Sequence, residues 1–290
     1  MVPFTGSAVA LVTPFNGDKV DFDALGELID FQISHKTDAI VVCGTTGEAP
    51  TMPSSEHMKV IEYSAEKINK RVPLIAGTGS NDTRHAQEMT YLAEKAGADA
   101  ILSVTPYYNK ANKSGLAEHY EKIAEATTLP IILYNVPSRT GLSIDFSVLE
   151  KLSKIRNIAA IKEASGNLSF ASDIAARLPD LTLYSGNDDI VVPMLSIGAK
   201  GVISVAANIF PEEMHDMTEL YLNGETEKAK RLQLDMLEVI KALFIEVNPV
   251  PVKSAMNFLG FPAGDLRLPL GEMSDANFEI MKNALLKFTK

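Results

Sequence analysis

Short apolar runs alternate with longer amphipathic segments along roughly the first three quarters of the chain. Most of the apolar runs are rich in Val, Ile and Leu without polar alternation, which is typical of parallel strands covered on both faces. They occupy residues 8–12, 39–43, 73–76, 100–104, 130–134, 158–162, 181–184 and 201–205. The segments between them, such as 23–34 and 116–126, place apolar residues three and four positions apart, which predicts helices.

The spacing of these segments predicts the fold class. Successive strands begin about 20 to 34 residues apart, the length of a strand–helix unit. Alternating strands and helices indicate a parallel sheet with right-handed crossovers, and eight such units favour a closed (β/α)8 TIM barrel over an open doubly wound sheet. No G-x-G-x-x-G follows the first predicted strand, and Gly77-Thr78-Gly79 is only a fragment of such a loop.

The strand pattern stops after about residue 222, and a helical tail follows. Residues 225–247 predict one long amphipathic helix, after which two prolines break the chain. Short helices are then expected at 252–259 and 275–287. We therefore predict a catalytic barrel at 1–222 and a C-terminal helical domain at 223–290, whose apolar faces must be buried on the barrel or on another subunit.

Composition restricts the partners and the compartment. A hydrophobic fraction of 46% and a charged fraction of 22% are ordinary for a soluble globular protein. The net charge of -10 argues against nucleic-acid or anionic-membrane partners, which require a basic face. No secretory signal or membrane-length apolar stretch is visible, and the single cysteine, Cys43, excludes an internal disulfide. We expect a cytoplasmic protein.

One predicted strand, 158–162, ends on Lys162. Burial disfavours the charged form of an amine, so a lysine in an apolar setting can act as a nucleophile and form a Schiff base with a ketone or aldehyde. The alternative is a structural lysine whose stem lies along the strand while its ammonium group reaches water. The run by itself leaves both interpretations open.

Other candidate groups follow neighbouring strands, at the end of the barrel where active sites form. The turn at 44–48, G-T-T-G-E, carries two hydroxyls and free backbone N–H groups that suit a carboxylate, although an ordinary capped turn would look the same. Tyr134 is either a strand cap or a proton shuttle for a lysine adduct. Arg139 is either a solvated loop charge or a bidentate carboxylate clamp. Together with Lys162, these groups match the needs of a keto acid.

The same segments carry a family resemblance. The turn at 44–48, the Y-N-V-P segment at 134–137 and the strand lysine resemble the pyruvate-dependent class I aldolases and lyases over essentially the whole chain. Within that group, Thr45-Thr46, T-P-Y-Y-N at 105–109 and S-R-T-G at 138–141 are similar to the dihydrodipicolinate synthase family.

This resemblance implies a lyase that condenses pyruvate with L-aspartate 4-semialdehyde to give 4-hydroxy-tetrahydrodipicolinate, the first committed step of diaminopimelate and lysine biosynthesis. Two alternatives remain at this point. One is a related lyase acting on a sialic acid or keto-deoxy sugar acid, and the other is a non-catalytic relative that keeps the barrel.

The resemblance also implies roles for individual residues. Lys162 forms the imine with pyruvate, and Tyr134 donates and accepts protons. Tyr134 is linked to Thr45 and to a tyrosine of a neighbouring subunit that corresponds to Tyr108. A homo-oligomer, commonly a dimer of dimers, is therefore expected.

Substrate contacts are implied in the same way. Thr46 joins Thr45 in holding the pyruvate carboxylate, and Arg139 receives the carboxylate of the semialdehyde. The carbonyl groups of Gly186 and Ile203 are expected near the site. No cofactor is expected, because the protonated imine itself withdraws electrons from the substrate.

Many members of this family are inhibited by lysine at a dimer-interface site, and the present chain matches that site only in part. His57, Asn81 and Tyr107 agree with it. Ala49, Ser54 and His85 stand where lysine-sensitive members tend to have serine, histidine and glutamate. Loss of that glutamate removes a partner for the ammonium groups of lysine, so weak or absent inhibition is expected.

Metal chemistry finds little support in the sequence. The five histidines are scattered and form no H-E-x-x-H motif. Asp188 and Asp189 follow the seventh predicted strand, where we expect them to cap the next helix. The sequence shows no flavin, nicotinamide or pyridoxal motif, and we predict no metal.

Overall fold

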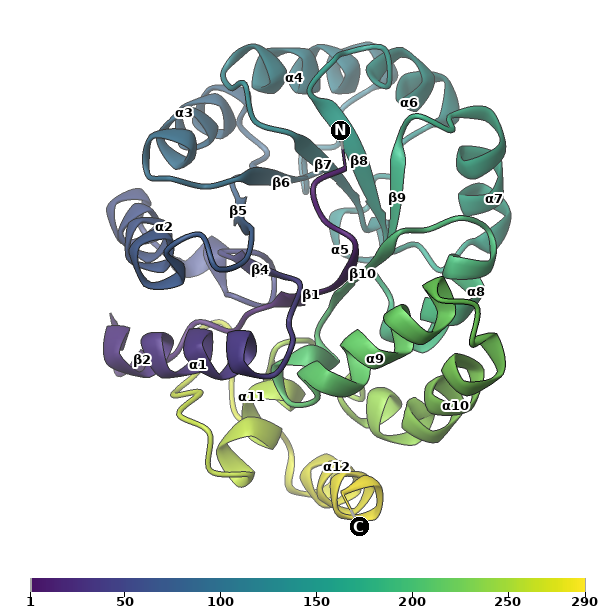
Figure 1. Ribbon diagram of the computed structural model, residues 1–290. Coiled ribbons are helices and arrows are strands. Elements are labelled where there is room, and N and C mark those ends of the chain that lie inside the picture. Colours follow the sequence, from purple (N-terminus) through teal and green to yellow (C-terminus); the bar gives the residue numbers. More distant parts are fainter. Residues whose placement is uncertain (1, 290) are drawn as a thin grey trace.

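The computed structural model describes residues 2–289 and contains a closed barrel of parallel strands (Figure 1). The barrel strands, in chain order, are β1 (Gly6–Ala10), β4 (Ala39–Val42), β5 (Leu74–Gly77), β6 (Ala100–Val104), β7 (Ile131–Asn135), β8 (Ile158–Glu163), β9 (Thr182–Ser185) and β10 (Gly201–Ser204). Sequential strands are neighbours, and β10 closes the barrel by pairing with β1. The predicted TIM barrel is confirmed, and each predicted strand ends within two residues of the observed one.

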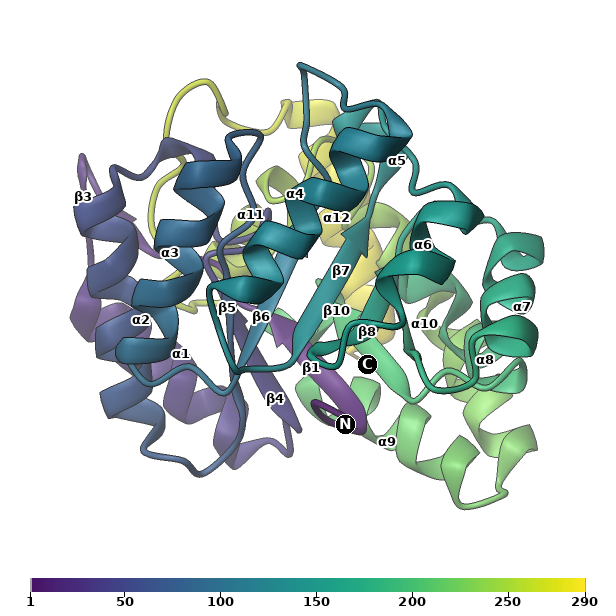
Figure 2. The ribbon, with the colours of Figure 1, turned by 90° about the horizontal axis from the view of Figure 1, so that it is seen from above.

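A helix follows each barrel strand and covers its outer face (Figure 1). These helices are α1 (Phe22–Ser34), α2 (Ser54–Ile68), α3 (Thr83–Lys95), α4 (Lys113–Glu125), α6 (Phe146–Leu152), α7 (Leu168–Arg177), α8 (Val191–Ser196) and α9 (Pro211–Leu222). Several begin at an Asp or Asn whose side chain accepts a backbone N–H of the first turn, as Asp82 does for α3 and Asn112 does for α4. Figure 2 shows α1 to α4 side by side along one flank of the barrel.

Shorter elements lie between these units. A hairpin of β2 (Phe15–Asn16) and β3 (Lys19–Val20) precedes α1. Single turns of helix follow four of the barrel strands, namely η1 (Ala49–Thr51), α5 (Pro137–Thr140), η2 (Asp188–Ile190) and η3 (Ala206–Asn208).

The strands divide their side chains between two hydrophobic cores. Ala160 belongs to the core inside the barrel, whereas Ile161 packs in the core between strands and helices. Because successive side chains of a strand point to opposite faces, Lys162 shares the inward face of Ala160, and Glu163 shares the outward face of Ile161. The strand phase therefore aims the lysine at the barrel interior.

The C-terminal extension consists of α10 (Thr226–Ala242), α11 (Val250–Phe258) and α12 (Asp275–Phe288). The prediction of one helix over 225–247 is wrong at its end, because α10 stops at Ala242 and an irregular segment runs to Pro249. Proline disfavours helical conformation in the residue before it, here Asn248, and does not account for the end of α10 several residues earlier. Pro251 lies in the first turn of α11 and does not interrupt it, because the N–H groups there need no helical partner.

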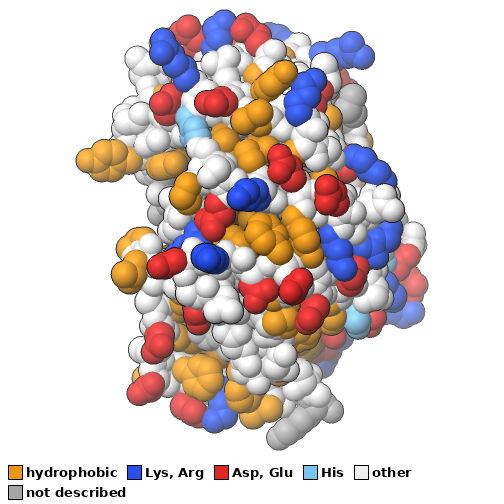
Figure 3. Space-filling model, turned by 90° about the vertical axis from the view of Figure 1, so that its left-hand side faces the viewer, with side chains coloured by type: hydrophobic (Ala, Val, Ile, Leu, Met, Phe, Trp, Pro, Cys, Tyr) orange, Lys and Arg blue, Asp and Glu red, His pale blue; other side chains and the backbone are white. Residues whose placement is uncertain are grey.

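Charged side chains of both signs are spread over the surface of the described residues. On the side shown in Figure 3, acidic and basic side chains are interspersed among apolar ones. Among residues 2–289, no helix combines the length and apolarity needed to cross a membrane.

Candidate active site

Lys162 and Tyr134 lie side by side at the carboxyl end of the barrel. They are register partners on β8 and β7, and the Lys162 Nζ lies 4.3 Å from the centroid of the Tyr134 ring. Both side chains are buried, with exposed fractions of 5% and 7%. The amine therefore faces an aromatic ring inside the barrel, and the interpretation of Lys162 as a lysine whose ammonium group reaches water does not hold.

A cavity of about 170 Å³ opens at this amine. It brings together six of the predicted site residues, namely Thr45, Thr46, Tyr134, Arg139, Lys162 and Gly186. Ile203 is fully buried in the core inside the barrel but does not line this cavity. Tyr108 is 91% exposed on the loop after β6 and also lies outside it. The cavity thus combines an amine, a phenol, two hydroxyls and a guanidinium group.

The segment after β7 presents Arg139 at the rim of this cavity. Pro137 occupies the first turn of α5, where its fixed φ favours helix, and Gly141 ends the helix with a left-handed φ of 68°. The Arg139 side chain is exposed and donates from Nη2 to the backbone oxygen of Asn248 at 3.2 Å. A guanidinium group at the mouth of a small cavity is suited to a carboxylate.

The turn at 44–48, here called the threonine turn, is held by groups from other parts of the chain. Asn248 donates from Nδ2 to Thr46 Oγ1 at 2.9 Å, and Thr13 donates from Oγ1 to the backbone oxygen of Gly47 at 2.8 Å. Glu48 is buried and pairs with Lys253 of α11, with 2.8 Å between Oε1 and Nζ. The turn is therefore tied both to the segment after β1 and to the C-terminal extension.

Asn248 is a site residue that sequence reasoning missed. It lines the cavity and contacts both Thr46 and Arg139, and its own Oδ1 is buried without a hydrogen-bond partner in the described chain. It directly follows the predicted helix 225–247, where no sequence pattern indicates contact with the threonine turn. A polar residue directly before Pro249, at the end of an apolar stretch, is the signal that could have revealed it.

Gly186 lies against Lys162. A Cβ at this position would approach Lys162 Cε to 3.1 Å and Ala164 Cβ to 2.5 Å. The backbone N–H of Gly186 also donates to the backbone oxygen of Glu163 at 2.8 Å, which draws the loop after β9 onto β8. Only glycine permits this close approach without displacing the lysine stem.

Two buried carboxyl groups flank this arrangement. Glu163 accepts hydrogen bonds from Asn135 Nδ2 at 2.7 Å and from the Ser165 backbone N–H at 2.6 Å, and burial raises its pKa. Burial also raises the pKa of Asp188. The expectation that Asp188 caps the following helix is wrong, because it accepts the backbone N–H groups of Val205 and Ala206 and thereby joins the loops after β9 and β10.

A larger cavity of about 420 Å³ adjoins the first and shares Thr45, Tyr134 and Arg139 with it. Four residues of the predicted effector site line it, namely Ala49, His57, His85 and Tyr107. Asn81 supports the same region by donating from Nδ2 to the backbone oxygen of Tyr107 at 3.2 Å. Burial lowers the pKa of His57, so this cavity wall contains a neutral imidazole near neutral pH.

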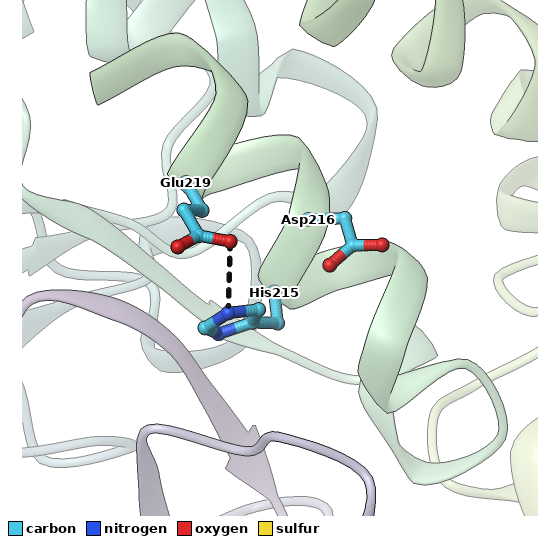
Figure 4. A group of neighbouring side chains, drawn as sticks. All are labelled: His215, Asp216 and Glu219. Atoms are coloured by element: carbon cyan, nitrogen blue, oxygen red, sulfur yellow. Dashed lines mark ion pairs between the residues drawn. The ribbon is translucent and has the colours of Figure 1, made fainter. Parts of the chain in front are cut away.

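Only one group of side chains in the described chain has the spacing of a metal site. His215, Asp216 and Glu219 lie together on α9 (Figure 4). His215 Nε2 lies 3.3 Å from Glu219 Oε2, its Nδ1 lies 2.9 Å from Asp38, and Lys36 pairs with Asp216 at 3.1 Å. These ion pairs account for the group, and it lines neither cavity, so we assign it no metal role.

Comparison with known proteins identifies relatives over nearly the whole chain. The model of the Dihydrodipicolinate synthetase family matches residues 3–287. The 4-hydroxy-tetrahydrodipicolinate synthase of Caldicellulosiruptor saccharolyticus is 56% identical over 286 residues, which cover 98% of this chain and 97% of the relative. That of Acetivibrio thermocellus is 56% identical over 282 residues, which cover 97% and 96%. The crystal structure of dihydrodipicolinate synthase from Aquifex aeolicus is 44% identical, with a TM-score of 0.97 over 99% of this chain and 98% of that one. The chain belongs to the dihydrodipicolinate synthetase family.

Proposed function

We propose that this protein is a 4-hydroxy-tetrahydrodipicolinate synthase, which condenses pyruvate with L-aspartate 4-semialdehyde through a Schiff base on Lys162. The contact that carries this proposal is the buried Lys162 amine 4.3 Å from the Tyr134 ring, in a cavity that also contains the threonine turn. Relatives with about 55% identity that are named for this activity support it.

The size and polarity of the cavity suit a three-carbon keto acid. A volume of about 170 Å³ lies below the roughly 300–1,000 Å³ of sites for drug-sized ligands. The hydroxyls of Thr45 and Thr46 bind the pyruvate carboxylate, which places the ketone carbon at the amine. Arg139, at the junction with the larger cavity, binds the carboxylate of the semialdehyde.

The proposed reaction uses the amine of Lys162 and the phenol of Tyr134. The Lys162 amine adds to the ketone of pyruvate, and loss of water leaves a protonated imine that draws electrons from the methyl group. A methyl proton leaves, and the resulting enamine attacks the aldehyde carbon of the second substrate. The amino group of that substrate displaces Lys162 from the imine carbon, which closes the ring and frees the enzyme. Tyr134 transfers the protons in these steps.

The assembly and the compartment belong to the same proposal. Tyr108 is 91% exposed on its own chain, so it acts in catalysis only if it enters the site of a second copy. We expect a homo-oligomer, with a dimer of dimers as the form, in the cytoplasm. A sedimentation measurement that finds only monomers in an active preparation would contradict this expectation.

The central experiment traps the imine. The protein is incubated with pyruvate and borohydride, digested, and analysed by mass spectrometry for a reduced pyruvyl adduct. We expect the adduct on Lys162 and none in a Lys162→Met variant. Lys253 is an internal control, because it is also buried but lies outside the cavity. An adduct on Lys253, or none at all, would overturn the mechanism.

A further inference from the structure

The C-terminal extension reaches the threonine turn through a fully buried ion pair. The side chains of Glu48 and Lys253 are 0% and 1% exposed, and their charged atoms lie 2.8 Å apart. The Lys253 Nζ also donates to the backbone oxygens of Thr13, at 2.9 Å, and of Asp265. Glu48 accepts a second hydrogen bond at Oε2 from the Arg267 backbone N–H at 3.0 Å. All three ammonium donors and both carboxylate oxygens therefore have partners.

A pair of this kind is a poor means of stabilising a fold. Removing two charges from water carries a large cost that their mutual attraction only roughly offsets, and apolar residues of similar size often stabilise a protein equally well. A buried ion pair does restrict geometry, since each charge tolerates few other arrangements. Glu48 lies two residues after Thr46, so the ion pair restricts the geometry of the threonine turn.

The backbone of the turn depends on that restriction. Glu48 has a left-handed φ of 55°, which a residue with a side chain rarely adopts without support. Its backbone oxygen accepts hydrogen bonds from the Thr51 N–H at 3.0 Å and the Thr51 Oγ1 at 2.9 Å, and its N–H donates to Thr45. Moving the Glu48 side chain would therefore move the backbone that carries both threonines.

We propose that the Glu48–Lys253 pair is a positioning device for the reaction, which fixes Thr45 and Thr46 in the conformation that binds the pyruvate carboxylate. The helical extension is then part of the catalytic machinery of the barrel. This inference rests on the proposed function, because it assumes that the turn binds pyruvate.

The test uses exchanges that keep side-chain volume. Glu48→Gln removes the negative charge, Lys253→Met removes the positive charge, and the double variant removes both and leaves no unpaired buried charge. For each, the pyruvate concentration that gives half-maximal borohydride trapping is measured, together with the KM of the semialdehyde and the melting temperature. We expect half-saturating pyruvate to rise at least tenfold in Glu48→Gln and in the double variant, with less than a threefold change in the KM of the semialdehyde.

Glu56→Gln provides a matched control. Glu56 pairs with Arg267 of the same extension and loses the same charge, but it lies on α2 and lines neither cavity. Its half-saturating pyruvate should stay within twofold of the wild type.

Each outcome separates the two proposals. If the double variant folds and its half-saturating pyruvate concentration is unchanged, the positioning role is overturned. If neither Glu48→Gln nor the double variant folds, the pair serves stability alone, which also overturns the positioning role. Absence of an adduct in the wild type refutes the proposed function itself.

Discussion

Replacement of Gly186 by alanine tests how tightly the reactive lysine is held. The added methyl group would lie 2.5 Å from Ala164 Cβ and 3.1 Å from both Lys162 Cε and the Glu163 backbone oxygen. Neither Ala164 nor the backbone oxygen can rotate away, so the conflict must move β8 or the loop after β9. Such overpacking typically costs about 1–3 kcal/mol. A displacement of the amine by about 1 Å is expected to slow imine formation by roughly 100-fold.

The assay combines urea unfolding with the rate of borohydride trapping at saturating pyruvate. A double variant separates the loss of stability from the slower trapping. Gly186→Ala combined with Ala164→Gly removes the contact at 2.5 Å but keeps the one to Lys162. We expect the double variant to recover most of the lost stability and to remain slow in trapping, with Ala164→Gly alone as its control. A Gly186→Ala variant with wild-type stability and trapping rate would refute the reasoning.

Three further predictions concern other parts of the site and its surroundings. Arg139→Ala should raise the KM of the semialdehyde far more than that of pyruvate, and equal increases would count against its assignment to the second substrate. Burial lowers the pKa of His119 from 6.5 to about 4. Between these pH values the unfolded chain binds more protons than the folded one, so the free energy of unfolding falls as the pH drops through this window. Between about pH 7 and pH 4.5 this loss amounts to about 2 kcal/mol. In His119→Gln, the change in the free energy of urea unfolding between these two pH values should shrink by that amount, and an unchanged difference would contradict the prediction. Because Ala49 and His85 depart from the predicted effector site, L-lysine should inhibit weakly or not at all, and an inhibition constant below the millimolar range would disprove this.

The barrel could be predicted from the sequence because its strands are covered on both faces. A strand such as 158–162 then appears as an unbroken apolar run, and eight such runs at regular spacing leave few alternative architectures. The inward direction of Lys162 follows from the same geometry, because its strand phase matches that of Ala160. The parts of the site that end strands were accordingly predictable, and the structure brings Thr45, Tyr134 and Lys162 to one cavity.

The contributions of the C-terminal extension could not be predicted in this way. The apolar spacing of α10 continues through Val247, but this residue is 52% exposed and lies beyond the helix. Periodicity reports which residues would share a face of a helix and does not report whether the helix continues. Asn248 contacts Thr46 and Lys253 contacts Glu48, at sequence separations of 202 and 205 residues, and only the folded chain shows which polar groups meet.

The two buried lysines show why burial alone does not identify a nucleophile. Lys253 and Lys162 each follow apolar residues in the sequence, in V-P-V-K and I-A-A-I-K. Lys253 Nζ donates to a carboxylate and two backbone oxygens, which are partners for all three N–H bonds of an ammonium group and leave no free lone pair. Lys162 instead faces an aromatic ring and an open cavity, so a carbonyl carbon can approach its nitrogen. The difference between a structural and a reactive lysine thus lies in the groups around the amine, and the strand end at the mouth of a barrel supplies the second kind of surroundings.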